Sequence, residues 1–188
     1  DSYASFRDNF YSSRQWLDSS TILISTRYSS GRCKGENKNQ AESSDIEGLP
    51  YLIERAKLDG KRVVVIGNTA EFHKVEGKWV ADYIYNLYKD DTDAIYKGEK
   101  IFSEADHLLW TNLTKATDKN TQIFDIATKF GVPYFDIVKL VCDDKNKICT
   151  TYTDEGYKTF FDYGHFTLEG AKFFGERLSE YGFDELLK

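Results

Sequence analysis

The sequence predicts an α/β fold in which helices cover both faces of a mostly parallel sheet, giving three layers. The clearest strand is the apolar run from Arg62 to Gly67, whose consecutive β-branched residues are typical of a strand buried on both faces. Predicted strands also alternate with predicted helices along the chain, as right-handed crossover connections between parallel strands require. The same alternation argues against an all-helical or all-strand architecture.

Strand patterns occupy residues 21–25, 62–67 and 132–138, and helical periodicity occupies residues 4–17, 48–58, 80–88, 117–130 and 167–181. Residues 32–45 and the remainder of 70–98 are polar or irregular, and we expect loops there. The last helix is expected to turn Ala171, Phe174 and Leu178 towards the core.

The composition suits one globular domain over residues 1–188, because 40% of the residues are hydrophobic and 15% are aromatic. A formal net charge of −6 argues against a nucleic-acid partner. No apolar run approaches the roughly 18–20 residues of a membrane-spanning helix. The chain has no methionine, so we expect it to be a processed or excised piece of a longer protein.

The three cysteines give information on the cellular compartment of the protein. Cys142 and Cys149 flank a polar turn within a hairpin-like segment, residues 142–157, and either a disulfide or two reduced thiols fit there. A disulfide closing so short a loop would contribute about 2.5 kcal/mol on the chain-entropy model. Cys33 is left unpaired, and no second Cys/His pair has the spacing of zinc ligands, so no metal site is expected. The cysteines favour a non-cytosolic compartment.

One of the three histidines lies in a sequence context that is typical of acyl-transfer sites. His165 follows Asp162 by three residues, in a glycine-containing turn before the last predicted helix. The carboxylate can hold one ring N–H while the other ring nitrogen faces a cleft. The loops 26–31, 67–73 and 158–166 follow strands, so we expect them at the carboxyl edge of the sheet, where such folds bind ligands. The alternative is that Asp162 caps the helix and His165 is a surface residue.

Three segments together resemble a known family. Residues 161–171 resemble the C-terminal block of SGNH hydrolases, where Asp and His complete a Ser-His-Asp triad. Residues 21–29 and 63–72 are similar to two strands with their loops in SGNH domains fused to membrane acyltransferases that O-acetylate polysaccharides. The Cys142/Cys149 hairpin also fits that branch. The resemblance covers most of residues 18–182 and implies a flavodoxin-like three-layer α/β/α SGNH fold, truncated at its N-terminus.

The nucleophile departs from the family pattern. The family's serine lies in a Gly-Asp-Ser block, and this chain opens with Asp1-Ser2. The segment between Ser2 and Thr21 is too short for the strand and loop that the family places there. Either Ser2 is the nucleophile or the true serine lies upstream of residue 1. The family's Gly-x-Asn-Asp block is also missing, so the resemblance implies that Arg27, or the backbone of the 26–31 loop, binds the oxyanion. Asn68 follows Gly67 and could donate a hydrogen bond, on a different strand from the family's oxyanion asparagine.

The resemblance implies O-acetyl transfer or ester hydrolysis on a carbohydrate. His165 would act as general base and then general acid, and Asp162 would orient its ring. Arg27 would stabilise the developing oxyanion. No metal or organic cofactor is needed. The implied partners are a carbohydrate substrate and a membrane acyltransferase domain that hands over the acetyl group, in a periplasmic or extracytoplasmic location.

Two other interpretations stay open. The chain could be a catalytically inactive SGNH module that binds polysaccharide or docks on a membrane acyltransferase, or a plain α/β ligand-binding domain. His73 and His107 are interpreted as surface histidines, although His73 lies close enough to a strand end to touch a substrate. Four aromatic residues fit either packing or a stacking platform for sugar rings: Trp79, Tyr83, Tyr85 and Tyr88.

Overall fold

The centre of the fold is a parallel sheet of three strands. The structure, a computed structural model, describes residues 9–25, 45–90, 98–114 and 117–188. The strands β1 (Thr21–Ile24), β2 (Arg62–Ile66) and β3 (Tyr134–Phe135) lie in that order, and both neighbouring pairs are parallel. The central strand β2 buries Val63, Val64 and Val65, so the predicted parallel arrangement is confirmed.

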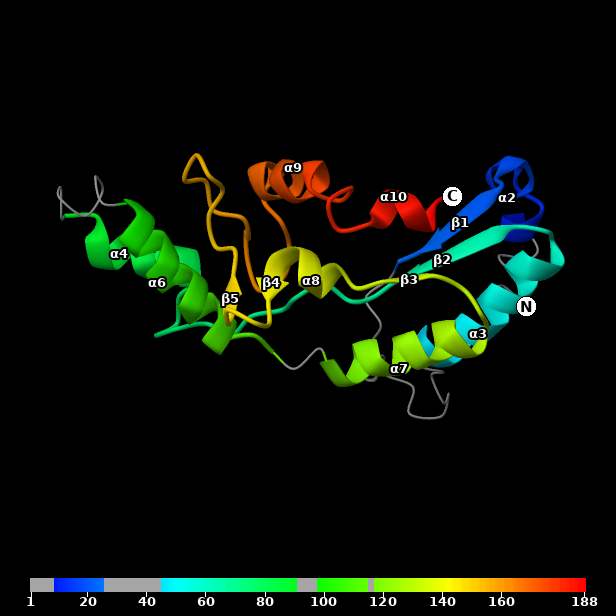
Figure 1. The fold of residues 1–188 in the computed structure, drawn as a ribbon, viewed down its shortest axis with the longest axis horizontal. Helices are drawn as coiled ribbons and strands as arrows, with labels where there is room; N and C mark the ends of the chain where they lie inside the picture. Colours follow the sequence, from blue (N-terminus) through cyan, green and yellow to red (C-terminus); the bar gives the residue numbers. More distant parts are fainter. Residues whose placement is uncertain (1–8, 26–44, 91–97, 115–116) are drawn as a thin grey trace.

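Helices cover the sheet on both faces, as Figure 1 shows. α3 (Asp45–Leu58) and α7 (Thr117–Lys129) pack together on one face, where Ile53 and Ile123 are fully buried. On the other face, α10 (Phe183–Leu186) sits against β3, with the rings of Phe135 and Phe183 5.0 Å apart. The layered α/β prediction is therefore confirmed.

A second apolar cluster forms at the other end of an elongated molecule (Figure 1). Its buried residues include Phe72, Ile84 and Phe174. The elements around it are α4 (Val80–Tyr88), α6 (Gly98–Thr111), α8 (Ile137–Val141), β4 (Cys142–Asp143), β5 (Ile148–Cys149) and α9 (Leu168–Glu176). Helix α6 has no counterpart in the sequence-based prediction.

Two predicted elements are wrong, and in both a side-chain cap accounts for the difference. Instead of one helix over 4–17, α2 (Arg14–Asp18) is a separate helix, because the Ser13 hydroxyl accepts a hydrogen bond from the Trp16 N–H at 3.2 Å; residues 1–8 lie outside the described part. Instead of a strand over 132–138, β3 has two residues. Asp136 then accepts from the Val138 N–H at 3.2 Å and starts α8.

The last predicted helix is also shorter than expected. α9 ends at Glu176, and Gly182, with φ of +78°, precedes the separate helix α10. Phe174 is buried and Leu178 partly buried, as predicted, but Ala171 is exposed.

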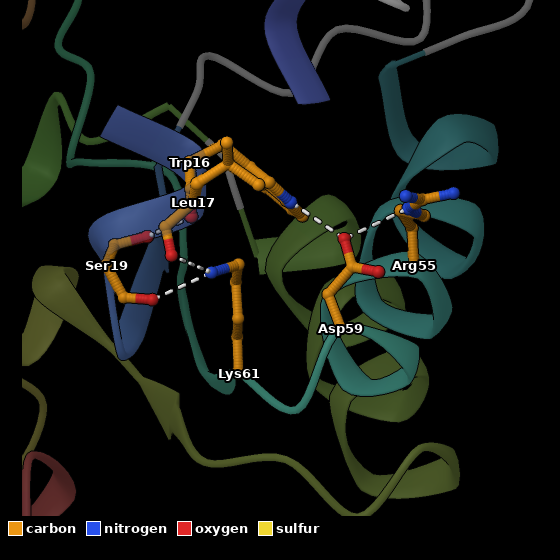
Figure 2. A network of polar contacts seen from close by, with 6 residues as sticks. All are labelled: Trp16, Leu17, Ser19, Arg55, Asp59 and Lys61. Carbon is orange, nitrogen blue, oxygen red and sulfur yellow. Dashed lines mark hydrogen bonds and ion pairs between the residues drawn. The ribbon is translucent and has the colours of Figure 1, made fainter. Parts of the chain in front are cut away.

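A polar network ties the N-terminal segment to the end of α3 (Figure 2). The Trp16 indole N–H donates to Asp59 Oδ2 at 2.7 Å, and Arg55 Nε donates to the same oxygen at 3.1 Å. Beside it, the residue Lys61 is only 9% exposed, and its ammonium donates to the Ser19 carbonyl at 2.8 Å. Because the ammonium of a buried lysine needs hydrogen-bond acceptors, this contact holds the start of β1 next to β2.

The hairpin is closed by a disulfide between Cys142 and Cys149, which decides between the two states that the sequence left open. The segment after it runs beside the loop that carries His165. The Thr159 N–H donates to the Thr151 carbonyl at 2.9 Å, and the Thr167 N–H donates to the Thr159 carbonyl at 2.9 Å. The segment that follows the hairpin therefore holds the loop that carries His165 through backbone hydrogen bonds. Among the described residues, no helix is long and apolar enough to cross a membrane.

Candidate active site

The Asp162 and His165 side chains are in direct contact. The Nδ1 atom of His165 lies 2.9 Å from both carboxylate oxygens of Asp162. The same carboxylate accepts hydrogen bonds from the backbone N–H groups of Gly164, at 3.1 Å, and His165, at 3.0 Å. These contacts fix both the turn and the ring, and they leave the Nε2 atom of the imidazole for another partner.

The environment of Asp162 keeps it ionised. Partial burial raises the pKa of this carboxyl, but the hydrogen bonds from the His165 ring and from two backbone N–H groups outweigh it and hold the pKa below its ordinary value. The Asp162 side chain is 21% exposed, whereas the His165 side chain is 66% exposed. The carboxylate is therefore mostly shielded from solvent, whereas the imidazole that it holds is mostly exposed.

The loop that carries the pair is held against the segment after β2. The Phe72 N–H donates to the Tyr163 carbonyl at 2.7 Å. Gly164 is buried there, and a Cβ atom at this position would come within 3.2 Å of the Ala70 carbonyl oxygen. The absence of a side chain at Gly164 thus allows the close approach that sets His165 at the sheet edge.

A cavity of about 260 Å³ lies beside the His165 ring. Ser25 follows β1, Gly67 follows β2 and Ile137 follows β3, so the carboxyl ends of all three strands reach this cavity. This is the edge at which parallel α/β sheets bind ligands. The described residues that line it are Ser25, Gly67, Asn68, Thr69, Glu71, Ile137, Tyr163, Gly164 and His165.

Asn68 lines the same cavity and is only 8% exposed. Its backbone is held by the Asn120 side chain, which accepts from the Asn68 N–H at 2.8 Å and donates to the Asn68 carbonyl at 3.0 Å. Next to it, the Thr69 hydroxyl is buried and has no hydrogen-bond partner among the described residues. The cavity wall at Asn68 and Thr69 therefore combines a backbone held by Asn120 with polar side chains.

Two of the predicted site residues, Ser2 and Arg27, lie outside the described residues. His165 and Asn68 line one cavity, and Asp162 contacts the His165 ring. Sequence reasoning missed Ser25, Thr69, Glu71 and Tyr163. Ser25 and Thr69 follow predicted strands, so their positions at strand ends were a usable signal, and Tyr163 lies within the Asp162–His165 turn itself.

The other two histidines lie apart from this pair. His107, on α6, approaches the Lys147 carbonyl through Nδ1 at 3.0 Å and lines neither the cavity nor its neighbour. His73 is exposed and lines an adjacent hollow of about 400 Å³. Among the described residues, no three His, Cys, Asp or Glu side chains are grouped so that they could hold a metal ion.

The four aromatic residues that the sequence grouped together do not share one surface. Trp79 lines the adjacent hollow, while Tyr83 and Tyr88 pack against the second apolar cluster. Tyr85 is 67% exposed and lines neither space.

Comparison with known proteins agrees with this fold. The family model described as "SGNH domain (fused to AT3 domains)" matches residues 3–180, and the chain belongs to this family. A similar solved structure is the periplasmic domain of a lipopolysaccharide acetyltransferase from Salmonella ser. Paratyphi A, with a TM-score of 0.54 and 16% sequence identity. The match covers 90% of this chain but only 57% of that one. None of the curated proteins compared with the chain matches it significantly.

Proposed function

We propose that the chain transfers or hydrolyses O-acyl groups on a carbohydrate, with O-acetyl as the acyl group and His165 as the acid–base residue. The observation that carries this proposal is the Asp162–His165 pair beside a cavity at the carboxyl edge of the sheet. An imidazole held through Nδ1 by a carboxylate presents Nε2 as a base, the arrangement found in serine acyl-transfer sites. Membership in a family of SGNH domains fused to AT3 domains supports the same chemistry.

The reaction would proceed in two balanced steps. A serine Oγ attacks the carbonyl carbon of the donor ester, its proton passes to His165 Nε2, and the leaving oxygen takes that proton as its bond to carbon breaks. A sugar hydroxyl or water then attacks the acyl-serine, gives its proton to Nε2, and the serine oxygen recovers it. Positioned proton transfer of this kind contributes about 10²–10⁴ in rate.

The donors for the developing oxyanion would be Arg27 and groups on the cavity wall. Asn68 lines the wall on a backbone clamped by Asn120, and the Thr69 hydroxyl is buried there without a partner among the described residues. Fixed donors of this kind stabilise a transition state without reorganisation, at about 10²–10³ in rate for each donor.

The nucleophile is proposed as a serine and is open to direct labelling. Ser2 is the family-based candidate, and Ser25 is the serine that lines the cavity among the described residues. A fluorophosphonate probe followed by peptide mass spectrometry would identify the labelled residue. Labelling of another serine would replace both candidates, and no labelled serine at all would overturn a serine nucleophile within this chain.

The proposed partners and location follow from the family. The acetyl group would come from a membrane acyltransferase domain, and the chain would work outside the cytoplasm. The Cys142–Cys149 disulfide supports this location because such bonds persist in oxidising compartments. The similar Salmonella structure is titled a periplasmic domain, which points the same way.

Hydrolysis of nitrophenyl acetate by the wild-type chain and by His165→Ala tests the proposal. The His165 variant should lose about 10²-fold or more in rate. His107→Ala is the matched control, since His107 is also an exposed histidine with one ring contact but lies away from the cavity. Equal rates for wild type and His165→Ala would overturn the catalytic role and leave an inactive binding module.

A further inference from the structure

A second hollow adjoins the His165 cavity and shares two of its walls. It has a volume of about 400 Å³, and Glu71 and Tyr163 line both spaces. Its remaining lining comes from Phe72, His73, Lys74, Trp79 and Thr114. The two spaces are therefore neighbouring compartments of one surface depression, with the imidazole in the first compartment only.

Aromatic rings connect the two compartments. The His165 and Tyr163 ring centroids are 5.2 Å apart, and the Tyr163 and Trp79 centroids are 6.4 Å apart. The indole is thus reached from the imidazole across one intervening ring. Trp79 itself is partly exposed and precedes α4, which is anchored in the second apolar cluster by Val80 and Ile84.

Charged and polar side chains line the same hollow as the indole. The Lys74 ammonium lies over the Trp79 ring, 4.6 Å from its centroid, so a sugar that stacks on that face displaces the flexible Lys74 side chain, whose ammonium can then donate to a sugar hydroxyl. The Glu71 backbone carbonyl accepts hydrogen bonds from the Thr114 N–H, at 2.7 Å, and hydroxyl, at 2.8 Å, and these contacts hold two lining residues together. An aromatic face beside hydrogen-bonding side chains suits a pyranose, which has apolar C–H faces and a polar edge.

We infer that the second hollow binds the neighbouring sugar of the acceptor glycan, with Trp79 as the stacking residue. It rests on the proposed function, because the sugar to be acylated would occupy the His165 cavity. Each space is close to the lower end of the size range of small-molecule sites, about 300 Å³, which suits one ring in each. The acceptor would then be an oligosaccharide of at least two residues rather than a free monosaccharide.

Binding, measured without catalysis, tests this inference. The wild-type chain is applied to an array of bacterial surface glycans that presents mono-, di- and tetrasaccharides, and the affinity for the best-bound glycan and for its monosaccharide is then measured by calorimetry. We expect wild type to bind the oligosaccharide at least about tenfold more tightly than the monosaccharide. Trp79→Ala should lose that preference, and Trp79→Phe, which keeps an aromatic face, should retain most of it.

Tyr85→Ala is the matched control, because Tyr85 is an exposed aromatic residue close in sequence that lines neither space. Its affinity should stay within about twofold of wild type. Circular dichroism checks that each variant is folded. If Trp79→Ala does not fold, Trp79→Leu takes its place, because leucine keeps an apolar side chain without an aromatic face and should also lose the preference. The inference is overturned if no oligosaccharide binds, if monosaccharides bind equally well, or if Trp79→Ala binds as wild type does while folded.

The His165→Ala variant separates the two proposals. If it binds the oligosaccharide normally and still hydrolyses ester as fast as wild type, the proposed chemistry fails while the sugar subsite stands. If ester hydrolysis depends on His165 but the Trp79 variants bind glycan unchanged, the subsite fails and the chemistry stands.

Discussion

Gly170 lies so close to Thr159 that a Cβ atom at position 170 would stand 2.1 Å from the Thr159 carbonyl oxygen. The two residues frame the loop that carries Asp162 and His165, and Thr167 caps α9 by accepting from the Gly170 N–H at 3.0 Å. The small residue at the start of α9 therefore sets how closely the helix packs against the loop that carries Asp162 and His165.

Gly170→Ala should destabilise the protein by about 1–3 kcal/mol, because the obstructing atom belongs to the backbone and cannot rotate away. Urea unfolding measures the loss. Gly175→Ala, in the same helix, is the control: a Cβ there meets nothing within 4 Å, so alanine should leave stability unchanged or raise it by up to about 1 kcal/mol. Equal effects at the two positions would contradict the steric account.

Asp162→Asn should reduce ester hydrolysis by about 10²-fold or more with the fold retained. The amide no longer offers two equivalent acceptor oxygens to Nδ1 and cannot stabilise the imidazolium by charge. Rates with nitrophenyl acetate and circular dichroism spectra are the measurements. Activity within threefold of wild type would remove the orienting role.

The same carboxylate should make stability fall in acid. Because the pKa of Asp162 is lower in the folded chain than its ordinary value of 3.8, the unfolded state binds more protons between the two values. The contribution of the Asp162 carboxylate to the free energy of unfolding is complete above its ordinary pKa. It disappears as the pH falls through the pKa that the carboxyl has in the folded chain. Urea midpoints of wild type and Asp162→Asn should differ most above about pH 4 and converge at lower pH; a constant difference would refute this.

Removing the disulfide should cost about 2.5 kcal/mol of folding free energy. The chain-entropy model gives this value for the short loop between Cys142 and Cys149. Chemical unfolding of the Cys142→Ala/Cys149→Ala variant measures the loss, with Cys33→Ser as the control for removing a thiol outside this bond. Because the hairpin supports the His165 loop through Thr151 and Thr159, ester hydrolysis should decline at a lower temperature in the double variant.

Trp16→Phe should raise the pKa of Asp59 towards its ordinary value. The indole hydrogen bond is the largest cause that holds this pKa down, and phenylalanine has no donor to replace it. Carboxyl carbon shifts measured by NMR over a pH titration report the change. In Arg55→Met the pKa should also rise, because the hydrogen bond from Arg55 and its charge both lower it. An unchanged titration in Trp16→Phe would show that the network in Figure 2 does not form in solution.

Sequence patterns predicted the elements that carry a strong period. The buried run at β2 and the helices α4 and α7 agree with prediction to within one residue at each end. Helix α6 was missed although Ile101, Ala105 and Leu109 recur at helical spacing, so a signal was present in a stretch to which no element was assigned. Over the short apolar run at 134–141, a strand and a helix cannot be told apart by hydrophobic pattern. The cap at Asp136 ends the strand and starts helix α8.

The candidate site likewise has a part that the sequence predicted and a part that it did not. Spacing alone brought Asp162 and His165 together, since both lie in one turn. The walls of the cavity could not be predicted in full because Ser25, Glu71 and Ile137 come from distant segments, and only the packing of the strands and of Gly164 against Ala70 brings them together.

The two apolar clusters meet at this site. The last β2 residue in the sheet's apolar cluster is Val65; the chain then passes Gly67 and Asn68 at the cavity wall and enters the second apolar cluster at Ala70 and Phe72. The candidate site thus lies where the two apolar clusters adjoin, and each side of it is stabilised by a separate set of side chains. A destabilising substitution inside either cluster should first misalign the candidate site. Loss of ester hydrolysis should therefore precede loss of the helical circular dichroism signal on heating.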